Sequence, residues 1–186
     1  MFRGWLDAGV RLIQLRTKAL GSGALLTLAQ ELAEDARSAR ATFILNDRAD
    51  LARLAGASGV HVGQTDLPPA DARRLLGADF IVGLSTHSEA EIAAALAEPV
   101  DYLGVGAVFG TTMKGPAHPT VGLALVARAA ELGSARATPI VAIGGITLER
   151  ASSVLEAGAS SVAVITDLLV GDPAARAREY LAVLGL

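Results

Sequence analysis

The stretch Thr42-Phe43-Ile44-Leu45-Asn46-Asp47-Arg48 decides the fold. Apolar and β-branched residues run without polar alternation and then give way to an amide, a carboxylate and a guanidinium. An uninterrupted apolar run of this length is typical of a strand that is buried on both faces of a parallel sheet. The polar residues that follow indicate that the chemistry of the protein begins where this strand ends.

Similar strands are predicted along the whole chain, and segments rich in Ala, Leu, Arg and Glu with helical periodicity lie between them. Besides Thr42–Asn46, the predicted strands are Arg11–Arg16, Gly59–Gly63, Ile81–Thr86, Tyr102–Val108, Pro139–Gly145 and Ser161–Asp167. Helix starts are indicated by a capping box of Ser88 and Glu91, by Thr147 and Asp172 as N-caps, and by Pro173 at a first helical position. No linker divides the chain, so residues 1–186 are predicted to form a single domain.

Repeated βα units fit either a doubly wound sheet or a (β/α)8 barrel, and the polar residues discriminate between them. They follow nearly every predicted strand, at Gln14–Lys18, Asn46–Arg48, Gly63–Asp66, Ser85–His87, Thr111–Lys114, Gly144-Gly145 and Ile165–Asp167. Function collects at the C-terminal ends of many strands in a barrel, but mainly at one switch point in a doubly wound sheet. A Rossmann G-x-G-x-x-G is also absent from the sequence. The pattern therefore predicts an α/β protein with a TIM (β/α)8 barrel.

The first strand of such a barrel has no counterpart in the sequence. Met1–Ala8 resembles the last turns of a helix, and the chain is shorter than the roughly 200 residues of a compact barrel. We expect a barrel that lacks its first β-strand, with Arg11–Arg16 and Ser161–Asp167 at the open edges, and a further strand encoded upstream of Met1. A misplaced start and a barrel that is open on one side are the alternatives.

Composition excludes several classes of function. The sequence has no Cys, which excludes disulfides, thiolate catalysis and Cys-ligated zinc, and its net charge of −3 provides no global basic field for nucleic acid. No apolar run reaches the ~18 residues of a membrane span, and no signal peptide opens the chain. A cytoplasmic protein that acts on small molecules, with no nucleic-acid or membrane partner, is expected.

Two carboxylates follow neighbouring predicted strands, Asp47 after Thr42–Asn46 and Asp66 after Gly59–Gly63. Adjacent strands lie ~4.8 Å apart, so both side chains are within reach of one hard cation. Mg²⁺ is typically held by one or two carboxylates together with water and substrate phosphate oxygens. The alternative is that each Asp caps the helix that follows it.

Three cations lie at the same predicted rim: Arg16, Lys18 and Lys114. Arg16 and Lys18 are two residues apart and face the same side of an extended segment. Together with Mg²⁺ they would surround a diphosphate, although each one taken alone is better interpreted as a solvated surface charge. Gly144-Gly145 and Ile165-Thr166 indicate a second phosphate site on backbone N–H groups, with a simple tight turn as the alternative.

The histidines carry less information. His61 faces either the barrel interior or the helix layer, where a structural role is expected. His87 precedes the capping Ser88, and His118 lies in a Gly/Pro-rich segment. No Ser/His/Asp grouping indicates acyl transfer, and no His/Asp cluster indicates zinc.

Taken together, the motifs resemble those of the thiamine-phosphate synthase family from Gln14 to about Leu169. The similar stretches are Ile13–Lys18, Asn46–Ala52, Gly59–Pro68, Gly83–Ser88 and Asp101–Gly106. The resemblance implies that a pyrimidine diphosphate and a thiazole phosphate are joined with Mg²⁺. Pyrophosphate leaves the pyrimidine CH₂ group, and the thiazole nitrogen captures the cation.

The resemblance also implies roles for individual residues. It assigns the pyrimidine diphosphate to Gln14, Arg16, Lys18, Asn46, Ser85 and Lys114, of which Ser85, Arg16 and Lys114 would be catalytic. It assigns the thiazole phosphate to Thr111, Thr112, Met113, Gly145, Ile165 and Thr166, and Mg²⁺ to Asp47 and Asp66. A site of cations and carboxylates suits this reaction, which needs charge stabilisation and substrate positioning but no nucleophilic side chain.

Two positions depart from the family pattern. Met113 stands where a second Thr is usual, and Asp167 stands where Ala follows the hydroxyl residue. Asp167 would weaken phosphate binding unless it points away from the site. Two other readings are a thiazole tautomerase of the same fold, which would not need Asp47 and Asp66, and a non-catalytic relative that binds thiamine precursors.

Overall fold

The described strands form one parallel sheet whose order follows the sequence. The computed structural model describes residues 1–110 and 119–186. The strands are β1 (Leu12–Leu15), β2 (Thr42–Asn46), β3 (Gly59–Val62), β4 (Ile81–Thr86), β5 (Tyr102–Gly106), β6 (Ile140–Ile143) and β7 (Ser161–Ala163). The sheet has 7 strands in the order β1-β2-β3-β4-β5-β6-β7, so each strand pairs with its neighbour in the sequence.

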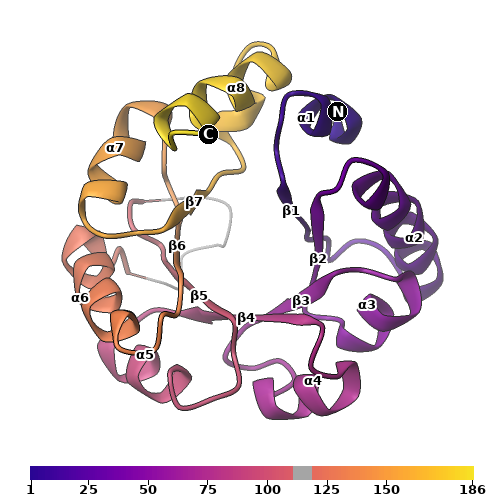
Figure 1. Cartoon of the computed structure of the whole chain (residues 1–186), viewed down its shortest axis with the longest axis horizontal. Coiled ribbons are helices and arrows are strands. Elements are labelled where there is room, and N and C mark those ends of the chain that lie inside the picture. Colours follow the sequence, from indigo (N-terminus) through magenta and orange to yellow (C-terminus); the bar gives the residue numbers. More distant parts are fainter. Residues whose placement is uncertain (111–118) are drawn as a thin grey trace.

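The helices lie outside this curled sheet and cover it as a ring (Figure 1). They are α1 (Phe2–Asp7), α2 (Ser22–Ser38), α3 (Ala49–Ala55), α4 (Pro69–Leu76), α5 (Glu89–Ala95), α6 (Gly122–Ser134), α7 (Leu148–Glu156) and α8 (Pro173–Val183), with a short 3₁₀ helix η1 (Asp167–Leu169) before α8. None of the helices in the described ranges is long and apolar enough to cross a membrane.

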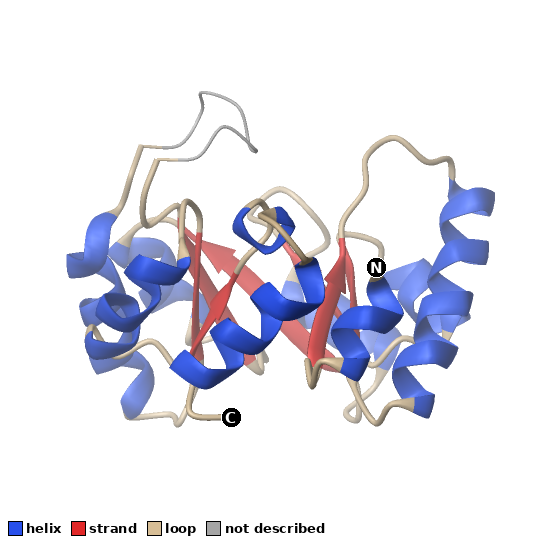
Figure 2. Cartoon of the chain, turned by 90° about the horizontal axis from the view of Figure 1, so that it is seen from above, coloured by secondary structure: helices blue, strands red, loops and turns tan. Residues whose placement is uncertain are grey.

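The sheet is open between β1 and β7, its two edge strands. On the outside of this opening α1 and α8 lie side by side (Figure 1), and Trp5 Nε1 donates to the backbone oxygen of Pro173 at 3.1 Å. In side view the strands rise toward a common rim (Figure 2). The prediction of an α/β barrel without its first strand is confirmed.

Predicted and observed strand bounds coincide for Thr42–Asn46 and Ile81–Thr86. The other strands were predicted too long, both at the edges of the sheet, where β1 and β7 are Leu12–Leu15 and Ser161–Ala163, and inside it, where β6 is Ile140–Ile143. The residues that extend the predicted strands lie in the connecting loops or, for Asp167, in η1.

Two of the predicted helix caps form as expected, and a third does not. Ser88 accepts from Glu91 N at 3.2 Å, and Asp172 accepts from Ala174 N and Ala175 N at 2.8 Å each. Thr147 takes the N-cap position of α7 but makes no side-chain cap bond. The carboxylate of Asp167 caps α7 instead, because it accepts from Leu148 N at 3.2 Å.

Glycine allows close approach inside the sheet, most clearly where β3 meets β4. A Cβ atom added to Gly59 would lie 2.2 Å from the backbone oxygen of Ile81 and 2.7 Å from its Cβ. Side chains from the outer face, such as those of Phe43, Leu45 and Val60, pack on Ala-rich helix faces and are almost completely buried. The short Ala side chains let the helices lie close to the sheet, in keeping with a core that is poor in aromatic residues.

We expect Gly59→Ala to destabilise the protein by about 3 kcal/mol or more, because β3 and β4 have to separate to accept the methyl group. Urea denaturation followed by circular dichroism measures the effect. Gly23→Ala is the matched control, since Gly23 lies in α2 with no heavy atom within 4 Å of an added Cβ. Equal unfolding midpoints for the two variants would contradict the close approach of the strands.

Candidate active site

A pair of carboxylates lies at the rim where β2 and β3 end. Asp47 follows β2 directly, and its backbone N–H donates to the oxygen of His61 at 2.8 Å. Asp47 has a φ of 65°, which few residues other than glycine adopt, although Asp and Asn tolerate it best. Asp66 lies in the turn after β3, where its Oδ2 accepts from Gly63 N at 2.8 Å. The turn geometry thus aims both carboxylates at one place.

Charged side chains from three neighbouring strand ends influence the pKa of Asp47. Burial raises the pKa of the Asp47 carboxyl, and the hydrogen bond and negative charge of Asp66 raise it further. The positive charges of Arg16 and Lys18 lower this pKa in part. Both cations lie on the segment after β1, so groups from β1, β2 and β3 meet at one point of the rim.

Amide and hydroxyl groups extend the polar rim from β1 to β4. Gln14 Nε2 donates to Asn46 Oδ1 at 2.6 Å, which joins the ends of β1 and β2. Ser85, near the end of β4, lies 2.8 Å from His61 Nε2, and its backbone oxygen accepts from Gln64 Nε2 at 2.7 Å. The structure therefore places at one part of the rim all the described residues that the family resemblance assigns to the pyrimidine diphosphate and its metal: Gln14, Arg16, Lys18, Asn46, Asp47, Asp66 and Ser85.

The carboxylate pair fits a Mg²⁺ site that is completed by substrate. In the part of the chain that the structure describes, no group of three or more His, Cys, Asp or Glu side chains could hold a metal alone. Mg²⁺ commonly takes one or two carboxylates and fills its octahedron with water and phosphate oxygens. Burial, and then the hydrogen bond and negative charge of Asp66, raise the pKa of Asp47, and a divalent cation bound by the two carboxylates would favour their ionised forms.

A second feature of the rim is a cavity of about 580 Å³ where β6 and β7 end. Its lining includes Ile143, Gly144, Gly145, Arg150, Ile165 and Thr166. Gly145 has a φ of 64°, and a Cβ atom there would lie 2.5 Å from the backbone oxygen of Gly110. The Gly-Gly turn therefore packs its backbone directly on the loop after β5, and Gly145, Ile165 and Thr166 share this cavity as expected.

The cavity has a cation that the sequence did not indicate. Arg150, in the first turn of α7, donates from Nη1 to the Gly145 oxygen at 2.9 Å, and its guanidinium lies 4.8 Å from the centre of the Phe109 ring. Strand ends were the signal used to find site residues, and Arg150 is on a helix. Its place in the first turn of the helix after the Gly-Gly motif is the sequence feature that could have indicated it.

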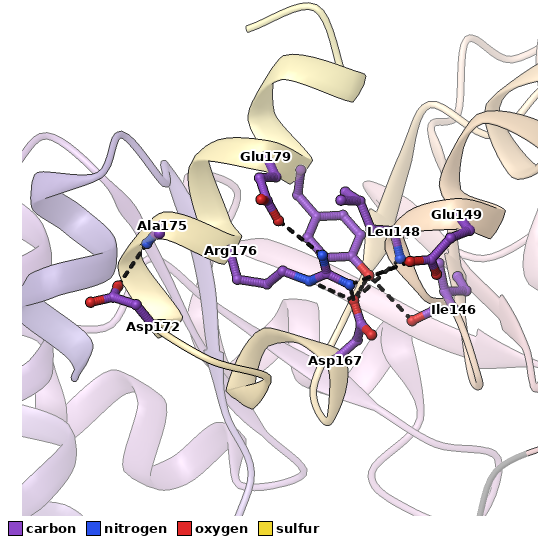
Figure 3. Close-up of polar contacts among 9 residues, drawn as sticks. Ile146, Leu148, Glu149, Asp167, Asp172, Ala175, Arg176 and Glu179 are labelled. Carbon is purple, nitrogen blue, oxygen red and sulfur yellow. Dashed lines mark hydrogen bonds and ion pairs between the residues drawn. The ribbon is translucent and has the colours of Figure 1, made fainter.

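Asp167 also lines this cavity, and its carboxylate is held by side chains of α8 (Figure 3). Its side chain is 12% exposed, and its Oδ2 accepts from Tyr180 Oη at 2.6 Å and from Arg176 Nη2 at 2.9 Å. Burial favours the protonated acid, but the bonds from Tyr180 and Arg176 and the charge of Arg176 outweigh it and lower the pKa of Asp167. Arg176 and Tyr180 of α8 therefore stabilise the negative charge of Asp167, which is expected from the sequence to weaken phosphate binding unless it points away.

The remaining site predictions lie outside the described residues: Thr111, Thr112, Met113 and Lys114, together with His118. His87 lies beside the rim, where its Nδ1 is 3.0 Å from Glu91 Oε2.

Comparison with known proteins identifies the family. The family model described as thiamine monophosphate synthase matches residues 2–168. The chain belongs to this family. Thiamine-phosphate synthase of Koribacter versatilis is 48% identical over 176 residues, which cover 95% of this chain and 81% of that protein. The thiamine-phosphate synthase of Moorella thermoacetica is 43% identical, with 99% of this chain and 87% of that protein covered.

Solved structures agree with this family assignment. Thiamine phosphate pyrophosphorylase from Pyrococcus furiosus superposes with a TM-score of 0.88 at 29% identity, covering 99% of this chain and 87% of the other. A 3-hexulose-6-phosphate synthase superposes with a TM-score of 0.71 at 21% identity, over 98% of this chain and 91% of the other. At that identity it shows a shared barrel fold only.

We expect Asp47→Asn to raise the melting temperature of the metal-free protein. The pKa of Asp47 is raised by folding, so ionising it costs stability, and this cost grows as the pH rises and is present at pH 7. Asn removes the charge and tolerates the positive φ. Differential scanning calorimetry at pH 7 in EDTA measures the gain.

Asp50→Asn is the control for this measurement, because the hydrogen bond from Arg48 lowers the pKa of Asp50 and its charge is therefore favourable. It should produce no gain in melting temperature. A gain in both variants, or in neither, would contradict an unfavourable charge at Asp47 that arises from its burial and from its contact with Asp66.

We expect Tyr180→Phe to lower the free energy of unfolding by about 2 kcal/mol, because it removes a hydrogen bond to a carboxylate while keeping the packed ring. Urea denaturation at pH 7 measures this change.

We expect Asp167→Asn to destabilise the protein at pH 7 as well. Because the pKa of Asp167 is lowered by folding, the stabilisation by its charge is present above about pH 4 and is lost as the pH falls through the folded-state pKa. Urea denaturation of wild type and Asp167→Asn at pH 7 and at acid pH tests this prediction. A difference in the free energy of unfolding that stays constant with pH would refute the role of the Asp167 charge.

Proposed function

We propose that this chain is a thiamine-phosphate synthase, which joins 4-amino-2-methyl-5-pyrimidinylmethyl diphosphate to a thiazole phosphate and releases pyrophosphate. The proposal rests on family membership and on one observation. Asp66, which follows β3, and the cations Arg16 and Lys18, which follow β1, all interact electrostatically with Asp47 at the rim. This arrangement of opposite charges suits a diphosphate held together with a divalent cation.

The residues at β1–β4 would bind the diphosphate substrate. Arg16 and Lys18 supply positive charge to the leaving diphosphate, and Lys114 is assigned to it by resemblance. Bound Mg²⁺, held by Asp47 and Asp66, would neutralise further charge on the leaving group. Gln14 and Ser85 lie deeper on the same rim and would hold the aminopyrimidine.

The cavity at β6 and β7 would receive the thiazole phosphate. Arg150 provides a positive charge there, and the Gly-Gly turn provides a backbone that can approach the ligand closely. With both substrates bound, the C–O bond between the pyrimidine CH₂ and the diphosphate breaks, and the thiazole nitrogen forms the new C–N bond with its lone pair. No proton has to be removed, so positioning and charge stabilisation supply the catalysis.

The direct test is to incubate the protein with both phosphorylated substrates and Mg²⁺ and to quantify thiamine phosphate and pyrophosphate. Equal amounts of both products are expected, and EDTA should abolish turnover reversibly. Tight Mg²⁺-dependent binding of the diphosphate without product would refute the synthase and favour the non-catalytic relative.

Separate sites for the two substrates predict a separation of kinetic effects. Arg16→Gln should raise KM for the diphosphate about tenfold or more, and Arg150→Gln should raise KM for the thiazole phosphate by a similar factor, each with little effect on the other substrate. Arg74→Gln is the control, since Arg74 lies on α4 with its side chain 81% exposed and paired with Asp71. If both site variants raised the same KM, the two-site interpretation would be wrong.

A further inference from the structure

A chain of hydrogen bonds runs inside the sheet from the start of β5 to the rim. Tyr102 Oη lies 2.8 Å from His61 Nδ1, and His61 Nε2 lies 2.8 Å from Ser85 Oγ. The three side chains come from β5, β3 and β4, and the register places His61 beside Gly83 and Gly83 beside Tyr102. This series of hydrogen bonds, Tyr102–His61–Ser85, ends on the Ser85 hydroxyl, which the resemblance assigns to the pyrimidine substrate.

The interior of the sheet is shaped to hold these rings. A Cβ atom on Gly83 would lie 2.1 Å from the Tyr102 ring, and one on Gly104 would lie 3.0 Å from His61 Cε1. The two rings contact each other with centroids 5.4 Å apart, and His61 is only 8% exposed. Glycine at both positions therefore makes room for two polar rings where β-branched residues would otherwise fill the sheet.

The chemistry of the groups gives the chain a direction. A neutral imidazole has one donor and one acceptor nitrogen, and the hydrogen bond on one nitrogen fixes the role of the other. Burial raises the pKa of Tyr102, so its hydroxyl keeps its proton and can donate it. A phenol is a stronger donor than an aliphatic hydroxyl, which favours donation from Tyr102 to Nδ1 and places the ring proton on Nε2.

We propose that His61 and Tyr102 are positioning residues that orient the Ser85 hydroxyl: Tyr102 donates to His61 Nδ1, His61 Nε2–H donates to Ser85 Oγ, and the Ser85 proton is directed to an acceptor nitrogen of the pyrimidine substrate. This inference rests on the proposed function. With this arrangement His61 and Tyr102 also determine which substrate binds. A ligand that presents an N–H donor to Ser85 would face the O–H donor of Ser85 instead of an acceptor.

A merely structural pair would satisfy buried polar atoms and nothing more. Removing the Tyr102 hydroxyl would then cost stability, but it would leave the catalysed reaction unchanged once the protein was folded. The two cases differ in whether Tyr102 and Ser85 act together on the substrate. The tautomer of His61 tests the direction of the hydrogen bonds, which the positioning role requires.

The tautomer is measured on the substrate-free protein, which keeps this arm independent of activity. Nitrogen-15 NMR of the imidazole rings should show His61 protonated on Nε2 in the wild type and altered in Tyr102→Phe. His87→Gln and His118→Gln identify the His61 signals by elimination. A wild-type ring protonated on Nδ1 would overturn the proposed direction.

Kinetics test the action on substrate. Tyr102→Phe should lower kcat/KM for the pyrimidine diphosphate about tenfold and leave KM for the thiazole phosphate unchanged. In a Ser85→Ala background the same change should have no further effect, because the hydroxyl that it orients is gone. Equal effects in both backgrounds would refute positioning through Ser85.

Thr86→Val is the matched control. Thr86 follows Ser85 on the opposite face of β4, is buried, and donates from Oγ1 to the Gly104 oxygen at 3.1 Å. It loses a buried hydroxyl bond like Tyr102→Phe, but kcat/KM should remain at the wild-type value. If the wild type formed no thiamine phosphate, the proposed function would fail while the NMR result still decided the direction of the hydrogen bonds.

Discussion

The parallel pairing of neighbouring strands is the constraint on which the rest of the structure depends. Because every described strand runs the same way, the C-terminal end of each strand reaches one rim, and residues far apart in the sequence meet there. Both the carboxylate pair at β2 and β3 and the cavity at β6 and β7 follow from this geometry. The curl of the sheet places β2 and β3 across its interior from β6 and β7 (Figure 1).

Some residues at the rim destabilise the folded state locally, and hydrogen bonds of the sheet compensate for this. Asp47 combines a left-handed backbone with a carboxyl that is harder to ionise than usual, and both features oppose folding. The compensation comes from the bonded strands beneath it, since its backbone N–H is fixed on β3. Asp167 shows the opposite balance, because its charge is stabilised by donors from α7 and α8 and strengthens the wall of the second site.

Much of the fold could be predicted from the sequence, because each apolar run and each polar strand end is a local signal. Thr42–Asn46 and Ile81–Thr86 are examples in which the local pattern and the final strand coincide. Strands such as β6 and β7 were predicted too long, because the apolar and glycine residues that follow them in the loops continue the pattern of the strand.

Contacts between distant elements were beyond the same reasoning. The role of Asp167 depends on Arg176 and Tyr180, which lie on α8, and the contact between His61 and Tyr102 depends on Gly83 in β4 and Gly104 in β5. The residues of the carboxylate pair were found because each one follows its own strand. Partners that approach from a helix or through the interior left no comparable mark in the sequence.

The hydrogen bonds of Asp167 also couple α8 to a cavity that this helix does not line. Among the described residues that line the cavity none belongs to α8, yet α8 supplies the two side chains that hold Asp167 in place. Local opening of α8 would release the carboxylate that caps α7 and loosen the cavity wall. By thermodynamic linkage, a thiazole phosphate that binds only the form in which α8 is packed must slow the exchange of α8 amide hydrogens with solvent. The frequency with which this helix opens locally then depends on the concentration of the ligand.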